Sequence, residues 1–112
     1  MCGICGIVNY SHGINEEFLR NMCAAIKHRG PDDEGIYLSN KGISVGLGHR
    51  RLSIIDLSSA GHQPMSNEDN TIWISFNGEI YNYKELKLIL EKKGHRFKSA
   101  TDTETLIHLY EE

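Results

Sequence analysis

The sequence predicts an α+β fold with antiparallel sheets. Segments of strand character outnumber the helical ones, and residues 35–39 and 43–49 flank Asn40, Lys41 and Gly42 like the arms of a hairpin. Three further segments carry apolar residues at helical spacing. A doubly wound sheet would need a helix between successive strands, so layers of helix and antiparallel sheet are the better prediction.

The first third of the chain predicts a strand and then an amphipathic helix. Residues 3–10 are mostly apolar and of strand length, and Asn15 can cap a helix whose first turn is acidic. Gly30 and Pro31 stop that helix. The residues expected on its buried face are Phe18, Leu19, Met22, Cys23 and Ile26.

The second half predicts a strand over residues 71–77, then a helix capped by Asn82, with Glu85 completing a capping box. That helix ends at Gly94. Its expected inward residues are Leu86, Ile89 and Leu90.

Residues 95–97 predict a short strand, and Thr101 or Asp102 caps a last helix. Its apolar residues at helical spacing are Leu106, Leu109 and Tyr110. Neither glycine nor proline ends this pattern by residue 112, so we expect a fragment of a longer protein.

Composition is that of one folded domain. The 112 residues are 39% hydrophobic and 24% charged with a net charge of -3, which excludes a disordered chain and a basic nucleic-acid footprint. The sequence has no apolar run near the roughly 20 residues of a membrane span, and its N-terminus lacks an export signal. Three cysteines fit a reducing compartment, so the prediction is a cytoplasmic protein without nucleic-acid or membrane partners.

The opening letters MCGICGIV allow three interpretations of Cys2. A redox pair with Cys5 is disfavoured, because such pairs sit at a helix start and this one lies in a strand-like run. A metal site needs four ligands, but Cys23 belongs to an apolar helix face and His28 has Arg29 as its neighbour. The sequence therefore predicts no metal ligands, and Cys5 is expected to be a small buried residue.

The third interpretation is an N-terminal nucleophile. Removal of Met1 would leave Cys2 with its thiol and a free α-amine on one residue. The pKa values of such groups, about 8.5 and 7.7–8.0, suit proton transfer at neutral pH, so the amine can serve as the base. A coincidence at position two remains the alternative.

Two inner motifs suggest ligand contacts. Arg50 and Arg51 end a strand and face opposite sides, so one can clamp a carboxylate in a pocket while the other meets solvent. Asn77 and Gly78 can offer an amide and a backbone N–H to an oxyanion. Two surface arginines and a plain turn are the alternatives.

Acidic residues complete the set of candidates. Glu79 and Asp102 can hold an ammonium group, although Asp102 also suits a helix cap. The segment HRGPDDEG at residues 28–35 favours a structural turn in which Arg29 pairs with Asp32 or Asp33.

Taken together, these motifs resemble the glutaminase domain of glutamine-hydrolysing asparagine synthetases, a class II glutamine amidotransferase with an N-terminal nucleophile. The resemblance spans the whole chain. It rests on MCGICGI, HRGPDDEG, HRRLSIIDL, QPM, FNGEIYNY and TDTETLIHLYEE.

The resemblance implies a four-layer α/β/β/α sandwich of which residues 1–112 form the first part. It implies that Cys2 attacks the side-chain amide of L-glutamine and that Asn77 and Gly78 hold the oxyanion. Arg51 would bind the substrate carboxylate, and Glu79 and Asp102 its ammonium group. The main chain lining the pocket would come from Leu52, Ser53, Ile54 and Ile55.

It also implies an absent C-terminal synthetase domain that uses ATP and magnesium to convert aspartate to asparagine, while this fragment itself needs no cofactor. That domain is an expected partner, and a homodimer is a further candidate. The alternatives are a non-catalytic interaction module and an amidotransferase with another acceptor. An isolated fragment is expected to be poorly soluble.

Overall fold

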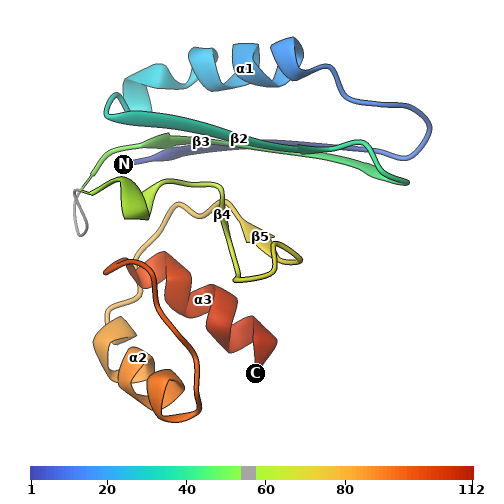
Figure 1. Ribbon diagram of the computed structural model, residues 1–112. Coiled ribbons are helices and arrows are strands. Elements are labelled where there is room, and N and C mark those ends of the chain that lie inside the picture. The colour runs from blue at the N-terminus through green and yellow to red at the C-terminus, as the bar shows by residue number, and fades with distance from the viewer. Residues whose placement is uncertain (54–57) are drawn as a thin grey trace.

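A computed structural model of the chain describes residues 1–53 and 58–112 (Figure 1). Its strands are β1 (Gly3–Asn9), β2 (Asp33–Ser39), β3 (Ser44–Arg51), β4 (Met65–Ser66) and β5 (Trp73–Ile74). Its helices are α1 (Glu16–Ala25), α2 (Tyr83–Lys92) and α3 (Asp102–Glu111), with short 3-10 turns at Lys27–Arg29 and Ser59–Gly61. Among the described residues, every helix is too short or too polar to cross a bilayer.

The strands form two antiparallel sheets. The larger has the order β1-β3-β2 and the smaller pairs β4 with β5, so the predicted α+β class with antiparallel sheets is confirmed. The hairpin β2–β3 is also confirmed, and Gly42 in its turn has a φ of 72°, a conformation that favours glycine.

Helix α1 covers one face of the larger sheet (Figure 1). The Asn15 side chain caps it by accepting from the N–H of Glu17, as predicted, and Leu19 and Cys23 are fully buried against the strands. Gly48 permits this close approach, because a Cβ there would lie 2.5 Å from the sulfur atoms of Cys5 and Cys23.

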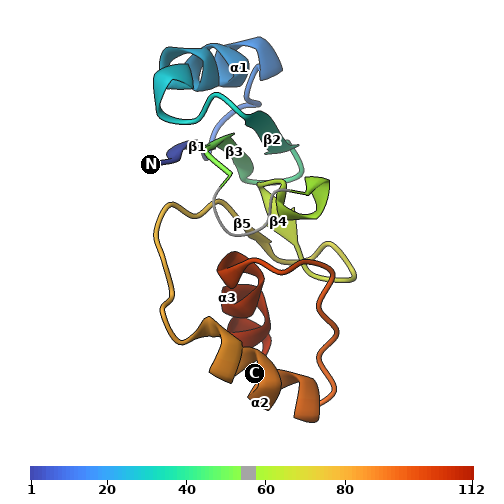
Figure 2. The ribbon, with the colours of Figure 1, turned by 90° about the vertical axis from the view of Figure 1, so that its left-hand side faces the viewer.

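The smaller sheet and the other two helices lie on the opposite side of the larger sheet (Figures 1 and 2). Stacked rings of Tyr37 and Trp73, with centroids 4.2 Å apart, join β2 to β5. Leu90 of α2 and Ile107 of α3 are almost completely buried. The order of elements across the molecule is therefore α1, the larger sheet, β4–β5, and then α3 and α2.

Several element predictions were wrong. The strand expected over residues 71–77 is reduced to β5, and residues 95–97 form no strand. Phe18 is 60% exposed, because it lies beside rather than on the α1 face that Leu19 and Cys23 define. Asn82 precedes α2 without a side-chain capping bond, so the capping box is absent.

The buried faces of α2 and α3 also differ from prediction. In α2 only Leu90 is buried, while Ile89 is exposed. In α3, Leu109 and Tyr110, two of the apolar residues at helical spacing, are exposed. The residues that this helix does bury are largely polar, and its first turn is buried all round: Asp102, Thr103, Glu104, Thr105, Ile107 and His108.

Candidate active site

A cavity of about 360 Å³ lies where the start of β1, the end of β3, residues 76–81 and the start of α3 meet. With Gly61 and Gln63 from the turn before β4, five segments of the sequence thus contribute to one site. The predicted residues that line it are Cys2, Arg51, Leu52, Asn77, Gly78, Glu79 and Asp102. Its size is within the range typical of small-molecule sites, about 300–1,000 Å³.

Cys2 is held through both its side chain and its main chain. Its Sγ accepts a hydrogen bond from the N–H of Leu52 at 3.2 Å and lies 3.6 Å from the carbonyl oxygen of the same residue. The guanidinium of Arg29 donates to the Cys2 carbonyl oxygen at 3.1 Å. The backbone N–H at Leu52 can stabilise negative charge on the sulfur, which suits a nucleophilic thiol.

Arg51 is buried at the cavity wall. Its Nη1 donates to the carbonyl oxygen of Ser58 at 2.7 Å. Gly61 makes room for the guanidinium, since a Cβ at that position would lie 2.3 Å from Nη2. The end of β3 and the turn at Ser59–Gly61 together therefore fix the orientation of the Arg51 guanidinium.

Arg50 points to the other face of β3, as strand alternation predicts, but its expected exposure to solvent was wrong. Its Nη1 pairs with Glu34 at 2.7 Å and its Nε donates to the carbonyl oxygen of Gly30 at 2.9 Å. The side chain is only 7% exposed, because β2 and the loop before it cover it.

Residues 76–80 are held between β3 and α3. The N–H of Phe76 donates to Gln63 Oε1 at 2.8 Å, and the Phe76 carbonyl oxygen lies 3.1 Å from His49 Nε2. Asp102 Oδ2 accepts from the N–H of Ile80 at 2.8 Å. These bonds position Asn77 and Gly78 at the cavity wall.

The acidic candidates differ in exposure. Asp102 is 5% exposed and is the first residue of α3, where Thr101 rather than Asp102 occupies the capping position without a side-chain capping bond. Glu79 is exposed and lines the cavity. With Arg51 also on the wall, the cavity carries both signs of charge, as a zwitterionic amino acid requires.

The predicted lining from residues 52–55 is found only in part. Leu52 lines the cavity, whereas the N–H of Ser53 donates to Asp32 Oδ2 and Ser53 borders a different surface pocket. Ile54 and Ile55 lie outside the described residues.

Several lining residues were not predicted from the sequence, among them His49, Gln63 and Thr103. Strand alternation could have identified His49, since it is two residues from Arg51 and shares its face of β3. Burial is the main cause that lowers the pKa of His49 below its ordinary value, so its ring is neutral at neutral pH. Gln63 donates to Thr103 Oγ1 at 3.1 Å and so ties the turn before β4 to α3.

The HRGPDDEG segment is structural, but its expected ion pairs were wrong. Arg29 binds the main chain of Cys2 rather than an acid. Asp32 accepts from Ser53, and Asp33 pairs with His62 Nδ1. The segment therefore contacts Cys2 at the cavity wall without lining the cavity itself.

The other cysteines lie on the far side of the sheet. Cys5 Sγ is 3.6 Å from Cys23 Sγ, between β1 and α1, while Cys2 faces the cavity. Cys5 is half-buried and Cys23 buried, and burial is the main cause that raises the pKa of Cys23 to about 12. Cys2 and Cys5 thus have separate surroundings, which disfavours a redox pair.

Comparison with known proteins identifies relatives along the entire chain. The family model described as a glutamine amidotransferase domain matches residues 1–112. A putative glutamine-hydrolysing asparagine synthetase 2 of Methanocaldococcus jannaschii is 48% identical over 98% of this chain and 24% of its own length.

Two further relatives agree. The glutamine-hydrolysing asparagine synthetase 2 of Bacillus subtilis is 48% identical over the whole of this chain and 15% of its own length. The corresponding enzyme 1 of Arabidopsis thaliana is 41% identical over the whole of this chain and 18% of its own length. The chain spans less than a quarter of the curated relatives that it matches.

Proposed function

This chain belongs to the glutamine amidotransferase family, and on that basis we propose that its cavity hydrolyses L-glutamine to glutamate and ammonia. The observation that carries the proposal is the convergence of seven predicted residues on one cavity that has charges of both signs.

The proposed reaction begins once Met1 has been removed. The α-amine of Cys2 takes the thiol proton, and Sγ attacks the side-chain amide carbon of glutamine. The C–N bond then breaks, ammonia leaves with the transferred proton, and a glutamyl thioester remains. Water attacks the thioester, and its collapse regenerates the thiol and releases glutamate.

The surrounding residues bind the substrate and stabilise charge. The Asn77 side-chain amide and the N–H of Gly78 donate to the oxyanion that forms in both steps. Arg51 binds the substrate α-carboxylate through its planar fork, and the main chain of Leu52 borders it. Asp102 and Glu79 bind the α-ammonium group.

In the full-length protein the ammonia would pass to a C-terminal synthetase domain that uses ATP and magnesium to convert aspartate to asparagine. This part of the proposal rests on the resemblance and on the relatives, which are longer glutamine-hydrolysing asparagine synthetases. Residues 1–112 would then be the first part of the glutaminase domain.

We also propose the four-layer sandwich for the complete domain. Cys5 faces α1, so alternation puts Ile4 and Val8 of β1 on the opposite face, where both are about half exposed. Apolar residues on this face, above β4–β5, are what a larger second sheet would cover. The order of elements in Figure 1 supports this arrangement.

Glutamate release by the full-length chain tests the proposed hydrolysis. Cys2→Ser should lower kcat by at least about 10³-fold, because an alkoxide is much harder to form than a thiolate at neutral pH. Cys5→Ser, on the other face of the sheet, is the matched control and should retain activity. Equal rates in the Cys2→Ser variant and the unchanged protein would contradict the proposal.

A further inference from the structure

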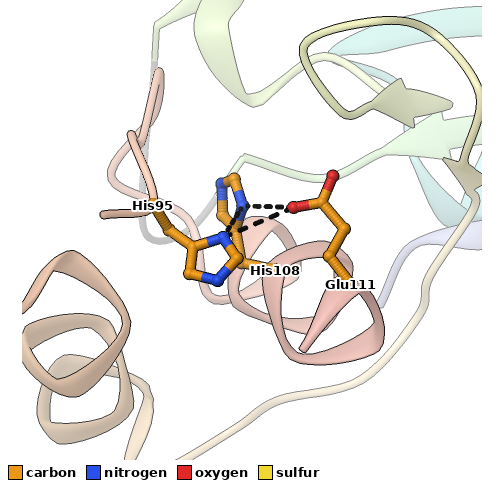
Figure 3. A group of neighbouring side chains, drawn as sticks. All are labelled: His95, His108 and Glu111. Atoms are coloured by element: carbon orange, nitrogen blue, oxygen red, sulfur yellow. Dashed lines mark hydrogen bonds and ion pairs between the residues drawn. The ribbon is translucent and has the colours of Figure 1, made fainter. Parts of the chain in front are cut away.

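A second group of side chains, none of which lines the cavity, converges between α2 and α3 (Figure 3). His108 and Glu111 are three residues apart on one face of α3, and His95 follows the end of α2. His95 Nδ1 lies 3.2 Å from His108 Nδ1 and 3.4 Å from Glu111 Oε2. The third distance, from His108 Nδ1 to Glu111 Oε2, is 3.1 Å.

These three distances match the edges of a metal coordination sphere. Zinc binds histidine nitrogen and carboxylate oxygen at about 2.0–2.2 Å, so two ligand atoms of a tetrahedral site are about 3.3 Å apart. The two nitrogens and one oxygen therefore have the separations that a single ion would impose.

The outer nitrogens of both rings are already engaged. His95 Nε2 lies 2.7 Å from Glu112 Oε2, and His108 Nε2 lies 3.4 Å from Glu104 Oε1. An ionised carboxylate only accepts hydrogen bonds, so these partners favour a proton on Nε2 of each ring, the tautomer whose Nδ1 lone pair is free to bind an ion. Carboxylate partners of this kind orient metal-binding histidines in proteins.

The supporting carboxylates are themselves held in place. Glu104 is buried and accepts from the N–H groups of Lys98 and Ser99, both at 2.7 Å. Asn67 Nδ2 donates to Glu111 Oε1 at 2.9 Å, which leaves Oε2 directed at the two rings. Hydrogen bonds within the protein thus hold these carboxylates in place without a bound ion.

Electrostatics favours a cation at the centre. Two nitrogen atoms and a carboxylate oxygen converge there, and their lone pairs repel one another unless a proton or a cation lies between them. Glu68 Oε1 is 3.9 Å from His108 Nδ1 on a half-exposed side chain, within reach of a fourth position. Of the three ligand side chains His108 is 2% exposed, His95 15% and Glu111 21%, so an ion could enter from the Glu111 side.

We propose that this chain binds one divalent zinc-class cation through His95 Nδ1, His108 Nδ1 and Glu111 Oε2, with Glu68 or water as the fourth ligand. Two imidazoles and a carboxylate suit Zn²⁺ better than Mg²⁺ or Ca²⁺, which prefer oxygen ligands. The ion would link α3 to the segment that follows α2. Since α3 starts at Asp102, it would also help to fix the cavity wall.

The sequence did not predict this site. The two histidines are 13 residues apart and belong to no recognisable metal motif. Only the packing of α2 on α3 brings them together.

The test titrates Zn²⁺ into the full-length chain, stripped with a chelator, in competition with a chromophoric indicator. We expect the unchanged protein to bind one Zn²⁺. The variants His95→Gln and Glu111→Gln, whose changes are at partly exposed residues, should bind Zn²⁺ on the order of 100-fold more weakly. Co²⁺, titrated in the same way, should give the visible absorption of a four-coordinate ion in the unchanged protein and not in these variants.

His12→Gln is the matched control, because His12 lies in an exposed loop hydrogen-bonded to Ser11, and it should bind Zn²⁺ unchanged. Far-UV circular dichroism confirms that each variant is folded. Equal Zn²⁺ affinity in His95→Gln and the unchanged protein would overturn the proposal. So would a failure of the unchanged protein to bind Zn²⁺, which would mean that the two histidines share a proton instead.

Discussion

At the scale of residues, Arg50 and Arg51 are neighbours with different surroundings. We predict that Arg51→Gln raises the KM for glutamine about 100-fold, because two charge-assisted hydrogen bonds of about 1.5 kcal/mol each are lost. Arg50→Gln should instead lower the free energy of unfolding, since it breaks the contact with Glu34. Steady-state kinetics and urea unfolding measure both effects, and a raised KM in Arg50→Gln alone would reverse the assignment.

Gly61 offers a more selective test of the same arginine. Gly61→Ala would put a methyl group 2.3 Å from Arg51 Nη2 and displace the guanidinium, so we predict a KM raised at least about tenfold with a smaller change in kcat. Gly13→Ala is the control, because the nearest atom to a Cβ there is 3.5 Å away. The same KM in both variants would show that Arg51 does not bind the substrate carboxylate.

The thiol of Cys23 should be inert in the folded protein. Burial raises its pKa from 9.0 to about 12, so the thiol stays protonated at a pH where the thiol of an unfolded chain would be partly ionised. We predict no alkylation of Cys23 by iodoacetamide at pH 8.5 until urea is added. Mass spectrometry of the peptide measures this, and rapid labelling without urea would contradict it.

The same shift makes stability depend on pH. The folded state holds the Cys23 proton more tightly than the unfolded state, so this contribution is complete below pH 9 and declines as the pH rises from 9 towards 12. Cys23→Ala should remove this part of the decline, which urea unfolding measured from pH 9 to 10 would detect.

At the scale of elements, two asparagines precede helices, but only one forms a cap. Asn15 Oδ1 accepts from the N–H of Glu17 at 2.8 Å, whereas Asn82 makes no capping bond. We predict that Asn15→Ala lowers the free energy of unfolding by about 1 kcal/mol and that Asn82→Ala changes it by less than about 0.5 kcal/mol. Equal losses in urea unfolding would contradict this difference.

The element predictions succeeded where local chemistry decides the structure. The β2–β3 hairpin follows from its turn residues, and α1 follows from its cap and apolar spacing. They failed where packing decides: α3 buries Glu104 and His108 rather than Leu109, because its polar face meets residues 98–99 and His95. Apolar periodicity alone cannot indicate a buried polar face.

The candidate residues of the cavity could be chosen from the sequence because their local motifs indicate a chemistry. Cys2, Arg51 and Asn77 belong to motifs with recognisable chemistry, whereas Gln63 contributes through hydrogen bonds to Phe76 and Thr103. Such a supporting role depends on contacts between distant segments, and one sequence alone does not indicate them. The His95 and His108 group is another example.

At the scale of the whole molecule, the larger sheet separates two environments. One face packs on α1 with Cys5 and Cys23, and the other carries the cavity with Cys2. The cavity and the packing against α1 therefore lie on opposite faces of β1. Because of this separation, Cys5 and Cys23 can serve as controls when the labelling of Cys2 is measured.

The central claim is that Cys2, freed from Met1, is the nucleophile. Its most direct test is intact-mass and peptide mass spectrometry of the full-length chain treated with a diazo-ketone analogue of glutamine. We predict a chain lacking Met1 that carries one adduct, on Cys2, with Cys5 and Cys23 unmodified. A chain that retains Met1, or one labelled equally on all three cysteines, would contradict the claim.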